Sequence, residues 1–240
     1  MNLENKTVLV TGGAVRIGRA ICEALAGAGC RVVLHCNRSV REARALAGRL
    51  RREGATAWVV RGDLTLRGAG ERVMARAFRL AGTVDILVNN AAVFHKQGLL
   101  TATADDLQRE WAVNLAAPLG LMQAFARRAR RGQIINLLDS RIASCRPDAV
   151  PYMLSKKALA ELTILAAREL APGITVNGVA PGAVLAAGRK GTAREKAGRC
   201  LIGRRPALED VVRAVLFLLQ SDSITGQIVY VDGGQNLVGH

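Results

Sequence analysis

The stretch TGGAVRIG (Thr11–Gly18) decides the fold of this chain. It follows the apolar run Thr7–Val10 and leads into Ile17–Ala28, which has helical periodicity. Glycines let backbone N–H groups approach an anion closely, and a helix N-terminus adds positive potential. The stretch therefore predicts a strand, a phosphate-binding turn and a helix. A turn without a ligand is the alternative, and the long cation of Arg16 stands where a small residue is expected.

Short apolar runs alternate with helical segments along the rest of the chain. The predicted strands are Thr7–Val10, Arg31–His35, Ala57–Val60, Ile86–Val88, Gln133–Leu138, Thr175–Val179 and Gln227–Val231. The predicted helices are Ile17–Ala28, Val40–Glu53, Gly70–Ala81, Asp105–Arg130, Tyr152–Leu170 and Glu209–Gln220. Strands this apolar are covered on both faces, which indicates a parallel sheet between helices. The prediction is a doubly wound α/β fold, with residues 1–240 in one domain and a substrate flap around residues 183–206.

The composition limits the classes of function. The formal net charge is +15, and 28 of the 34 basic residues are arginine, spread over the chain. No nucleic-acid motif accompanies this charge, so we interpret it as a compositional bias that attracts phosphorylated ligands and expect no nucleic-acid partner.

Cysteine and hydropathy patterns address metal sites and compartment. The five cysteines form no CxxC pair and the chain has three histidines, so we expect free thiols and no metal site. No signal peptide and no run of about 18 apolar residues is found, so we expect a cytoplasmic protein without a membrane span.

The end of the second predicted strand favours NADPH over NADH. An enzyme that uses NAD commonly has an acidic residue there to bind the ribose 2′-hydroxyl. This chain instead has His35, Arg38 and Ser39, a donor-rich set that suits the 2′-phosphate of NADP. The alternative for Arg38 is a loop cap. Asp63, after the third strand, is expected to accept from the adenine amine or to serve as a turn residue.

Tyr152 and Lys156 form a YxxxK pattern at the start of a predicted helix. A spacing of four residues places both side chains on one helix face. A free tyrosine has a pKa of about 10 and is a poor acid at neutral pH. An ammonium about 4 Å away favours the phenolate by roughly 4 kcal/mol at an effective dielectric constant of 20, before lysine desolvation is counted.

These motifs together resemble those of the short-chain dehydrogenase/reductase family. The matching residues are TGGAVRIG, Asp63, NNAA (Asn89–Ala92), Asn114 in VNLAAP, Tyr152 and Lys156, APG (Ala180–Gly182) and TGQIVYVDGG. The resemblance implies one Rossmann-like domain with a seven-stranded parallel sheet, hydride transfer from NADPH, and a homotetramer. It further implies that Tyr152 donates the proton, and that Lys156 holds the nicotinamide ribose and lowers the pKa of Tyr152. Asn114 would support a proton-relay water or, alternatively, satisfy helix backbone.

The resemblance also assigns the cofactor-binding set. It comprises Thr11, Gly12, Arg16, Ile17, Gly18, His35, Arg38, Ser39, Asp63, Leu64, Asn89, Ala91, Tyr152, Lys156, Pro181 and Gly182.

Two departures from the family pattern point to the substrate. Asp139 stands where the family usually has a serine that binds the substrate carbonyl, although a one-residue slip would place Ser140 there. The second departure is Arg16. Both resemble the pteridine reductases, where Phe94 would stack on the pterin and Asp139 would bind it or relay its proton. Arg16 would reach both the cofactor phosphates and the pterin carbonyl.

The expected substrate is therefore a dihydropterin, with dihydrofolate as an open possibility. For Phe94 the alternative is core packing, and for Arg16 it is a surface ion pair. Two other functions stay open: an NADPH-dependent carbonyl reductase, such as a 3-oxoacyl-carrier-protein reductase, and a non-catalytic protein that senses NADP or binds nucleic acid.

Overall fold

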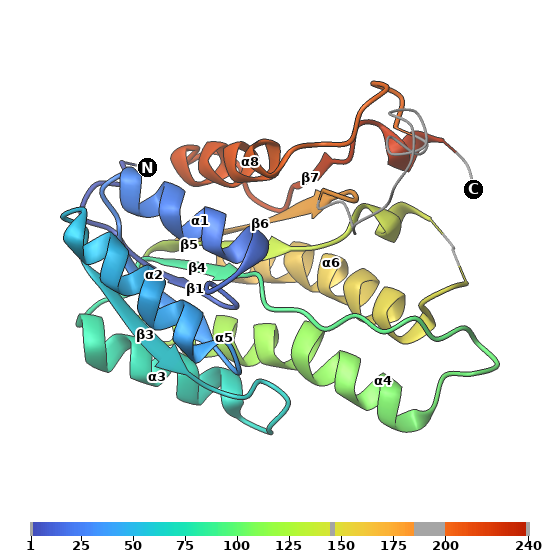
Figure 1. Ribbon diagram of the computed structural model, residues 1–240, viewed down its shortest axis with the longest axis horizontal. Helices are drawn as coiled ribbons and strands as arrows, with labels where there is room; N and C mark the ends of the chain where they lie inside the picture. Colours follow the sequence, from blue (N-terminus) through green and yellow to red (C-terminus); the bar gives the residue numbers. More distant parts are fainter. Residues whose placement is uncertain (1, 145–146, 185–199, 239–240) are drawn as a thin grey trace.

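Seven parallel strands form one central sheet in the order β3-β2-β1-β4-β5-β6-β7 (Figure 1). The computed structural model describes residues 2–144, 147–184 and 200–238. The strands are β1 (Thr7–Val10), β2 (Arg31–Cys36), β3 (Ala57–Arg61), β4 (Ile86–Asn89), β5 (Gly132–Leu137), β6 (Ile174–Pro181) and β7 (Ile228–Val231). The predicted doubly wound sheet is confirmed.

Helices cover both faces of this sheet. One face carries α1 (Arg16–Gly27), α2 (Val40–Arg52) and α8 (Leu208–Gln220), and the other carries α3 (Ala69–Ala81), α4 (Ala104–Trp111), α5 (Ala117–Ala126) and α6 (Val150–Leu170) (Figure 1). Every residue of β1, β4 and β5 is buried. This two-sided burial is why these strands are apolar throughout rather than alternating.

The predicted helix Asp105–Arg130 occurs as an unbroken helical run from Ala104 to Ala126, but its hydrogen-bond pattern changes in the middle. A π-helical turn, η1 (Ala112–Ala116), separates α4 from α5. Pro118 lies at the start of α5 and has no N–H to donate to the carbonyl of Asn114, four residues earlier. A π-turn relieves the resulting break in the ladder, and such turns are frequent at functional sites. Asn114 lies within this turn.

Two short 3₁₀ helices, η2 (Ser140–Ala143) and η3 (Gln235–Leu237), complete the elements of the described residues. Of the predicted flap, residues 185–199 lie outside the described residues. Within the described part of the chain, no helix has the length and apolar character needed to cross a membrane. The described cysteines (Cys22, Cys30, Cys36 and Cys200) are free thiols, and no metal-binding cluster occurs among the residues placed by the structure.

Candidate active site

A cavity of about 1510 Å³ opens at the carboxyl ends of β1, β4, β5 and β6. The strand order reverses between β1 and β4, and ligands of open α/β sheets bind at such a reversal. The expected site residues that line it are Gly12, Arg16, Ile17, Gly18, His35, Arg38, Ser39, Asp63, Leu64, Ala91, Phe94, Asp139, Tyr152, Lys156, Pro181 and Gly182. Thr11, Asn89 and Asn114 are buried and do not line it.

The glycine turn is held closed against the end of β4. The side-chain amide of Asn90 donates to the carbonyl oxygens of Thr11 (2.8 Å) and Gly12 (3.2 Å). The Thr11 hydroxyl accepts from the backbone N–H groups of Asn90 and Ala91. A Cβ at Gly18 would lie 2.5 Å from Asn90 Nδ2 and even closer to the carbonyl oxygen of Gly12, so it would clash with both. The turn thus accepts only glycine at position 18. The buried Thr11 supports the turn through these hydrogen bonds and does not face the cavity.

The side chain of Asn89 faces away from the cavity, so any contact of this residue with the cofactor is left to its backbone, as the sequence predicts. It donates to Asn136 Oδ1 (2.8 Å), and Asn136 in turn donates to Thr163. The neighbouring Asn90 lines the cavity instead. In a strand, successive side chains point to opposite faces, so the strand register decides which of two adjacent asparagines reaches the site.

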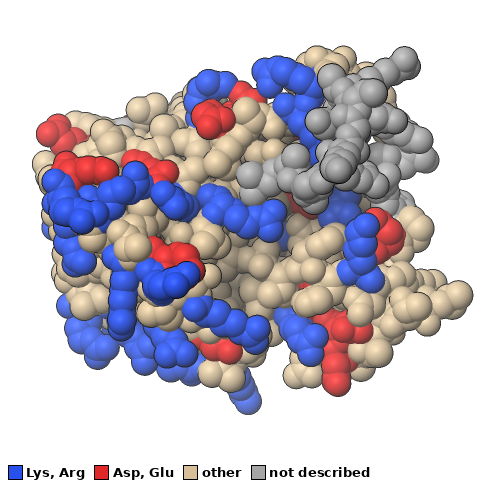
Figure 2. Space-filling view, in the orientation of Figure 1, with Lys and Arg blue, Asp and Glu red and all other residues tan. Residues whose placement is uncertain are grey.

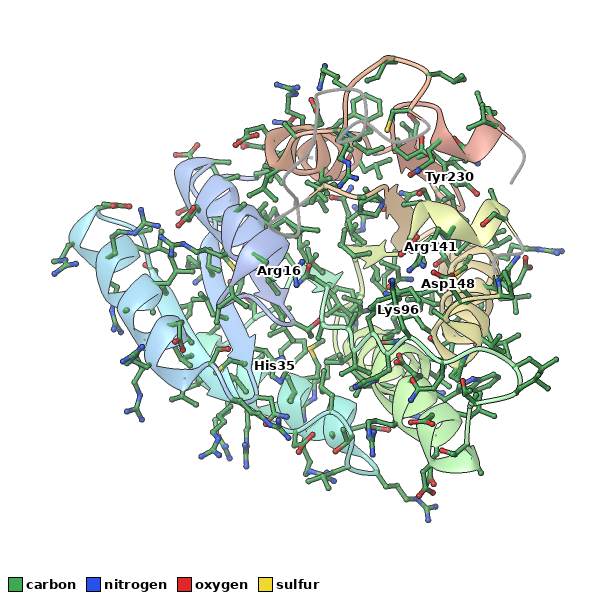
Figure 3. The ribbon with its side chains drawn as sticks, turned by 45° about the vertical axis from the view of Figure 1, so that its right-hand side comes forward. Arg16, His35, Lys96, Arg141, Asp148 and Tyr230 are labelled. Carbon is green, nitrogen blue, oxygen red and sulfur yellow. The ribbon has the colours of Figure 1, made fainter. Side chains whose placement is uncertain are left out.

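Arg16 occupies a backbone conformation that favours glycine. Its φ is +53°, and it is the first residue of α1. A non-glycine residue in this region carries strain of about 1–3 kcal/mol, and such strain is concentrated at functional sites. Arg16 is exposed and lies across the site from Arg141, as Figure 3 shows. The arginine therefore keeps the geometry of the glycine turn and adds a cation to the cavity wall.

His35 is a structural residue, which corrects its expected role as a phosphate donor. Its side chain is buried, with Nδ1 accepting from Gly12 N (3.3 Å) and Nε2 lying 3.1 Å from Gly62 O. Since Nδ1 accepts, Nε2 carries the proton and donates to Gly62. Burial lowers the pKa of His35 to about 4, against weaker raising effects from Gly62 and Asp63. The neutral ring ties the glycine turn to the end of β3.

We expect this neutral histidine to make stability depend on pH. In the unfolded chain His35 takes a proton near pH 6.5, but in the folded chain only near pH 4. The unfolded state binds more protons between these values, so the free energy of unfolding falls by about 3 kcal/mol as pH drops from 6.5 to 4. Urea unfolding of wild type and His35→Asn across this range measures it. Equal slopes in the two proteins would contradict the assignment.

The end of β2 presents an anion-binding arrangement at the cavity wall. Arg38 is exposed, and Ser39 is the N-cap of α2, whose amino end adds positive potential. Asp63 lies nearby in a turn, where Oδ1 accepts from the backbone N–H (3.0 Å) and hydroxyl (2.7 Å) of Thr65. These bonds lower the pKa of Asp63. Lysine and arginine cover much of the side of the molecule that carries α2 and α3 (Figure 2).

A carboxylate, a phenol and a guanidinium meet at the other end of the cavity. The Tyr152 hydroxyl donates to Asp139 Oδ2 (2.9 Å). Arg141 holds the same carboxylate through its backbone N–H (2.9 Å) and Nε (3.2 Å) at Oδ1 and through Nη2 (3.3 Å) at Oδ2. Asp148 lies 3.7 Å from Arg141 Nη1. Sequence reasoning missed Arg141, although a cation two residues after Asp139 was visible.

Phe94 is half exposed at the cavity wall, so core packing does not explain it. Its ring meets the Tyr152 ring edge to face, with centroids 4.8 Å apart. The Arg141 guanidinium lies over the Phe94 ring at 5.0 Å from its centroid and at 5.4 Å from that of Tyr152. Phe94 is therefore in contact with both a cation and the catalytic tyrosine, and it keeps exposed surface at the cavity wall.

The pKa of Tyr152 is shifted in the direction opposite to the one expected. Burial raises its pKa well above 10, and the charge and hydrogen bond of Asp139 raise it further, against a lowering effect of Arg141. The expected lowering of this pKa is therefore not what the structure shows. Burial lowers the pKa of Lys156 to about 8, and its ammonium donates to Leu137 O (2.7 Å). At neutral pH the site holds a protonated phenol and an ammonium.

Comparisons with known proteins agree with this geometry. Residues 6–197 match the family model described as short chain dehydrogenase. A sorbitol dehydrogenase of Cereibacter sphaeroides is 34% identical over 260 residues, covering 98% of each chain. The crystal structure of FolM alternative dihydrofolate reductase 1 from Brucella canis, complexed with NADP, has a TM-score of 0.93 at 36% identity over 99% of this chain and 97% of that one.

A second solved structure has a similar fold over almost the whole chain. A short chain dehydrogenase from Burkholderia cenocepacia J2315, in complex with NADP, has a TM-score of 0.90 at 33% identity, covering 98% of this chain and 100% of that chain. The family model covers most of the sequence, and the relatives align over nearly its full length. The chain therefore belongs to the short-chain dehydrogenase family.

Proposed function

We propose that this protein is an NADPH-dependent reductase of a pteridine. The observation that carries the proposal is the carboxylate of Asp139, which accepts a hydrogen bond from the Tyr152 hydroxyl in the substrate half of the cavity. The Brucella canis structure, named for alternative dihydrofolate reductase activity, supports the same substrate class by likeness. The sorbitol dehydrogenase relative favours an alcohol or ketone substrate instead, so the two classes are tested against each other.

The residues present fit NADPH. The turn at Gly18 leaves no room for a Cβ, as a backbone cradle for a pyrophosphate requires. Arg38 and the amino end of α2 suit a 2′-phosphate, and Lys156 at the other end would hold the nicotinamide ribose. NADP also occurs in the solved complexes from Brucella canis and Burkholderia cenocepacia. When bound, the cofactor supplies a hydride.

We expect Arg38→Asp to reverse the cofactor preference. The carboxylate would repel the 2′-phosphate and accept from the 2′-hydroxyl of NADH. Loss of one charge-assisted contact corresponds to roughly 10–100-fold weaker NADPH binding. Titration of both cofactors by fluorescence, with Arg41→Asp on the exposed face of α2 as the control, measures this change. Equal affinity of the wild type for NADPH and NADH would contradict the proposal.

The donor and acceptor pattern of the substrate half suits a pterin. A pterin ring carries N–H and amino groups that can donate hydrogen bonds to the carboxylate of Asp139. It also carries a carbonyl oxygen and ring nitrogens that can accept hydrogen bonds from Arg16. Phe94 offers an aromatic face at the same place. Reduction of a C=N bond needs a proton on nitrogen, and the Tyr152 hydroxyl holds one at neutral pH. Asp139 orients that hydroxyl, and Arg141 orients Asp139.

Substrate-dependent oxidation of NADPH tests the proposal. The panel contains dihydropterins and dihydrofolate on one side and ketoses, simple ketones and acetoacetyl thioesters on the other. The proposal expects the pterins to give the highest kcat/KM. Turnover of ketones alone would replace it with the carbonyl reductase alternative.

We also propose that the protein assembles as a homotetramer. Helices α4, α5 and α6 carry exposed apolar side chains at Leu107, Trp111, Leu119, Leu154 and Leu165. Exposed apolar patches of this kind commonly mark association surfaces. Light scattering at micromolar concentration should give about four times the 25.5 kDa chain mass. A monomer mass would exclude this assembly.

A further inference from the structure

Glu110 is a carboxylate with no exposed surface, next to the catalytic residues. Its Oε1 accepts from the backbone N–H and from Nδ1 of His95, each at 2.9 Å. Its Oε2 accepts from Asn114 Nδ2 at 2.7 Å. A buried carboxylate is strongly unfavourable unless it is hydrogen-bonded and its charge is balanced. The three donors satisfy the hydrogen-bonding capacity of the carboxylate, and the balance of its charge requires a nearby cation.

The network continues from Glu110 to the catalytic helix. Asn114 Nδ2 lies 3.1 Å from Ser155 Oγ, and that hydroxyl donates to the backbone oxygen of Tyr152 (2.7 Å). Lys156 follows Ser155 and is 2% exposed. The negative charges of Asp139 and Glu110 both raise the pKa of Lys156 against the lowering effect of burial. The Asn114 and Ser155 hydrogen bonds therefore connect Glu110 to the helix that carries Lys156, and the negative charge of Glu110 favours the Lys156 ammonium.

We propose that Glu110 is a positioning residue of the active site, which fixes the amide of Asn114 and balances the buried charge of Lys156. His95 closes the network where the loop after β4 reaches the cavity. Glu110 itself does not line the cavity, so it acts through these neighbours and not on the substrate. This role of Glu110 acts on Tyr152 and Lys156, whichever substrate is reduced.

Among the described residues, the charges of Asp139 at the end of β5 and Glu110 on α4 act on Lys156. Those of Asp139, Arg141 and Glu110 act on Tyr152. His95 faces Glu110 and Asp106 of α4. Asp139 touches the reacting groups, whereas Glu110 can be changed without removing a group from the cavity. A change at Glu110 therefore isolates the effect of the buried charge.

The titration of Lys156 provides a test that needs no substrate. The chain has six lysines, so ¹³C-labelled lysine gives few signals, and Lys156→Arg assigns the one of interest. Glu110→Gln should lower the Lys156 midpoint from about 8 by on the order of one unit. Glu161→Gln, the same change at an exposed site on α6, should leave the midpoint in place. An unchanged midpoint in Glu110→Gln would overturn the proposal.

Two further measurements separate charge from packing and folding. Glu110→Asp keeps the charge, so its Lys156 midpoint should stay near that of the wild type. A fall as large as in Glu110→Gln would overturn the proposal. The wild type alone provides the second measurement, because the ¹³C carboxyl signal of Glu110 should shift with the same midpoint as Lys156. No shift at that pH would also overturn it.

Kinetics extend the test once a substrate is in hand. Because Glu110 lies outside the cavity, Glu110→Gln should lower kcat about 10-fold or more with little change in KM. The alkaline limb of its pH–rate profile should move to lower pH, in step with Lys156. A change confined to KM would contradict a positioning role. Failure of every substrate would count against the proposed function alone, because the titration test stands apart from it.

Discussion

Asp139→Ser is expected to cut dihydropterin reduction by about 10²–10⁴-fold, the range associated with positioned acid–base groups. The serine hydroxyl restores the donor that the family usually presents to a carbonyl, and it removes the acceptor that a pterin needs. Turnover of ketones or oxoacyl thioesters should be retained or gained. Steady-state kinetics on both substrate classes measure the switch. Unchanged pterin turnover would remove the main reason for choosing a pterin.

Two companion variants separate charge from position. Asp139→Asn keeps the shape and loses the charge, so it should also be poor with pterins. Ser140→Ala should be well tolerated, because the Tyr152 hydroxyl donates to Asp139. If Ser140→Ala lost pterin turnover while the Asp139 variants kept it, Ser140 and not Asp139 would be the residue that acts on the substrate.

The same variant should change the pH dependence of turnover. Asp139 raises the pKa of Tyr152 by its charge and by its hydrogen bond, whereas Arg141 lowers it. Removal of the carboxylate therefore lowers this pKa. The charge of Asp139 also raises the pKa of Lys156, whose titration near pH 8 sets the alkaline limb, so this limb should move to lower pH in Asp139→Ser as well.

Gly18→Ala is expected to abolish tight NADPH binding or to unfold the protein. The new methyl would overlap the carbonyl of Gly12 and the amide of Asn90, both of which are held by the β1–β4 contacts. Overpacking of this kind costs about 1–3 kcal/mol when the surroundings can shift, and more when a backbone atom is the obstacle. Thermal unfolding and cofactor titration of the same sample measure the two possible outcomes.

Gly48→Ala is the matched control for this change. Gly48 lies in the middle of α2, and a Cβ there meets nothing within 4 Å. Alanine is favoured over glycine in a helix by about 0.5–1 kcal/mol, so this variant should be slightly more stable than the wild type. A Gly18→Ala protein as stable and as tight for NADPH as the control would show that the turn is looser than its contacts indicate.

The sequence by itself determined the sheet and placed the glycine turn and Arg38 at the cavity. Continuous apolar strands between amphipathic helices allow few arrangements, and the glycine turn after β1 carries a local backbone requirement that can be read from eight residues. Arg38 was equally readable, because it follows a strand end at which the expected acidic residue is missing. These features depend on neighbours in sequence, and the structure confirms the fold that they predicted.

The tertiary structure decided the environment of the catalytic groups. His35 was expected to donate to the 2′-phosphate, but burial directs its two ring nitrogens to Gly12 and Gly62. The pKa of Tyr152 was expected to fall, but burial and Asp139 raise it. Desolvation depends on every element packed around a group, and a spacing of four residues does not report it.

Glu110 is the clearest case of what only the tertiary structure decided. In sequence it is one acidic residue on an amphipathic helix, and the pattern gives no reason to separate it from Asp105 or Asp106. Packing of α4 against α6 and the loop after β4 removes it from water and brings His95 and Asn114 to its two oxygens. Its role follows from the free energy of burying a charge, which only the assembled fold sets.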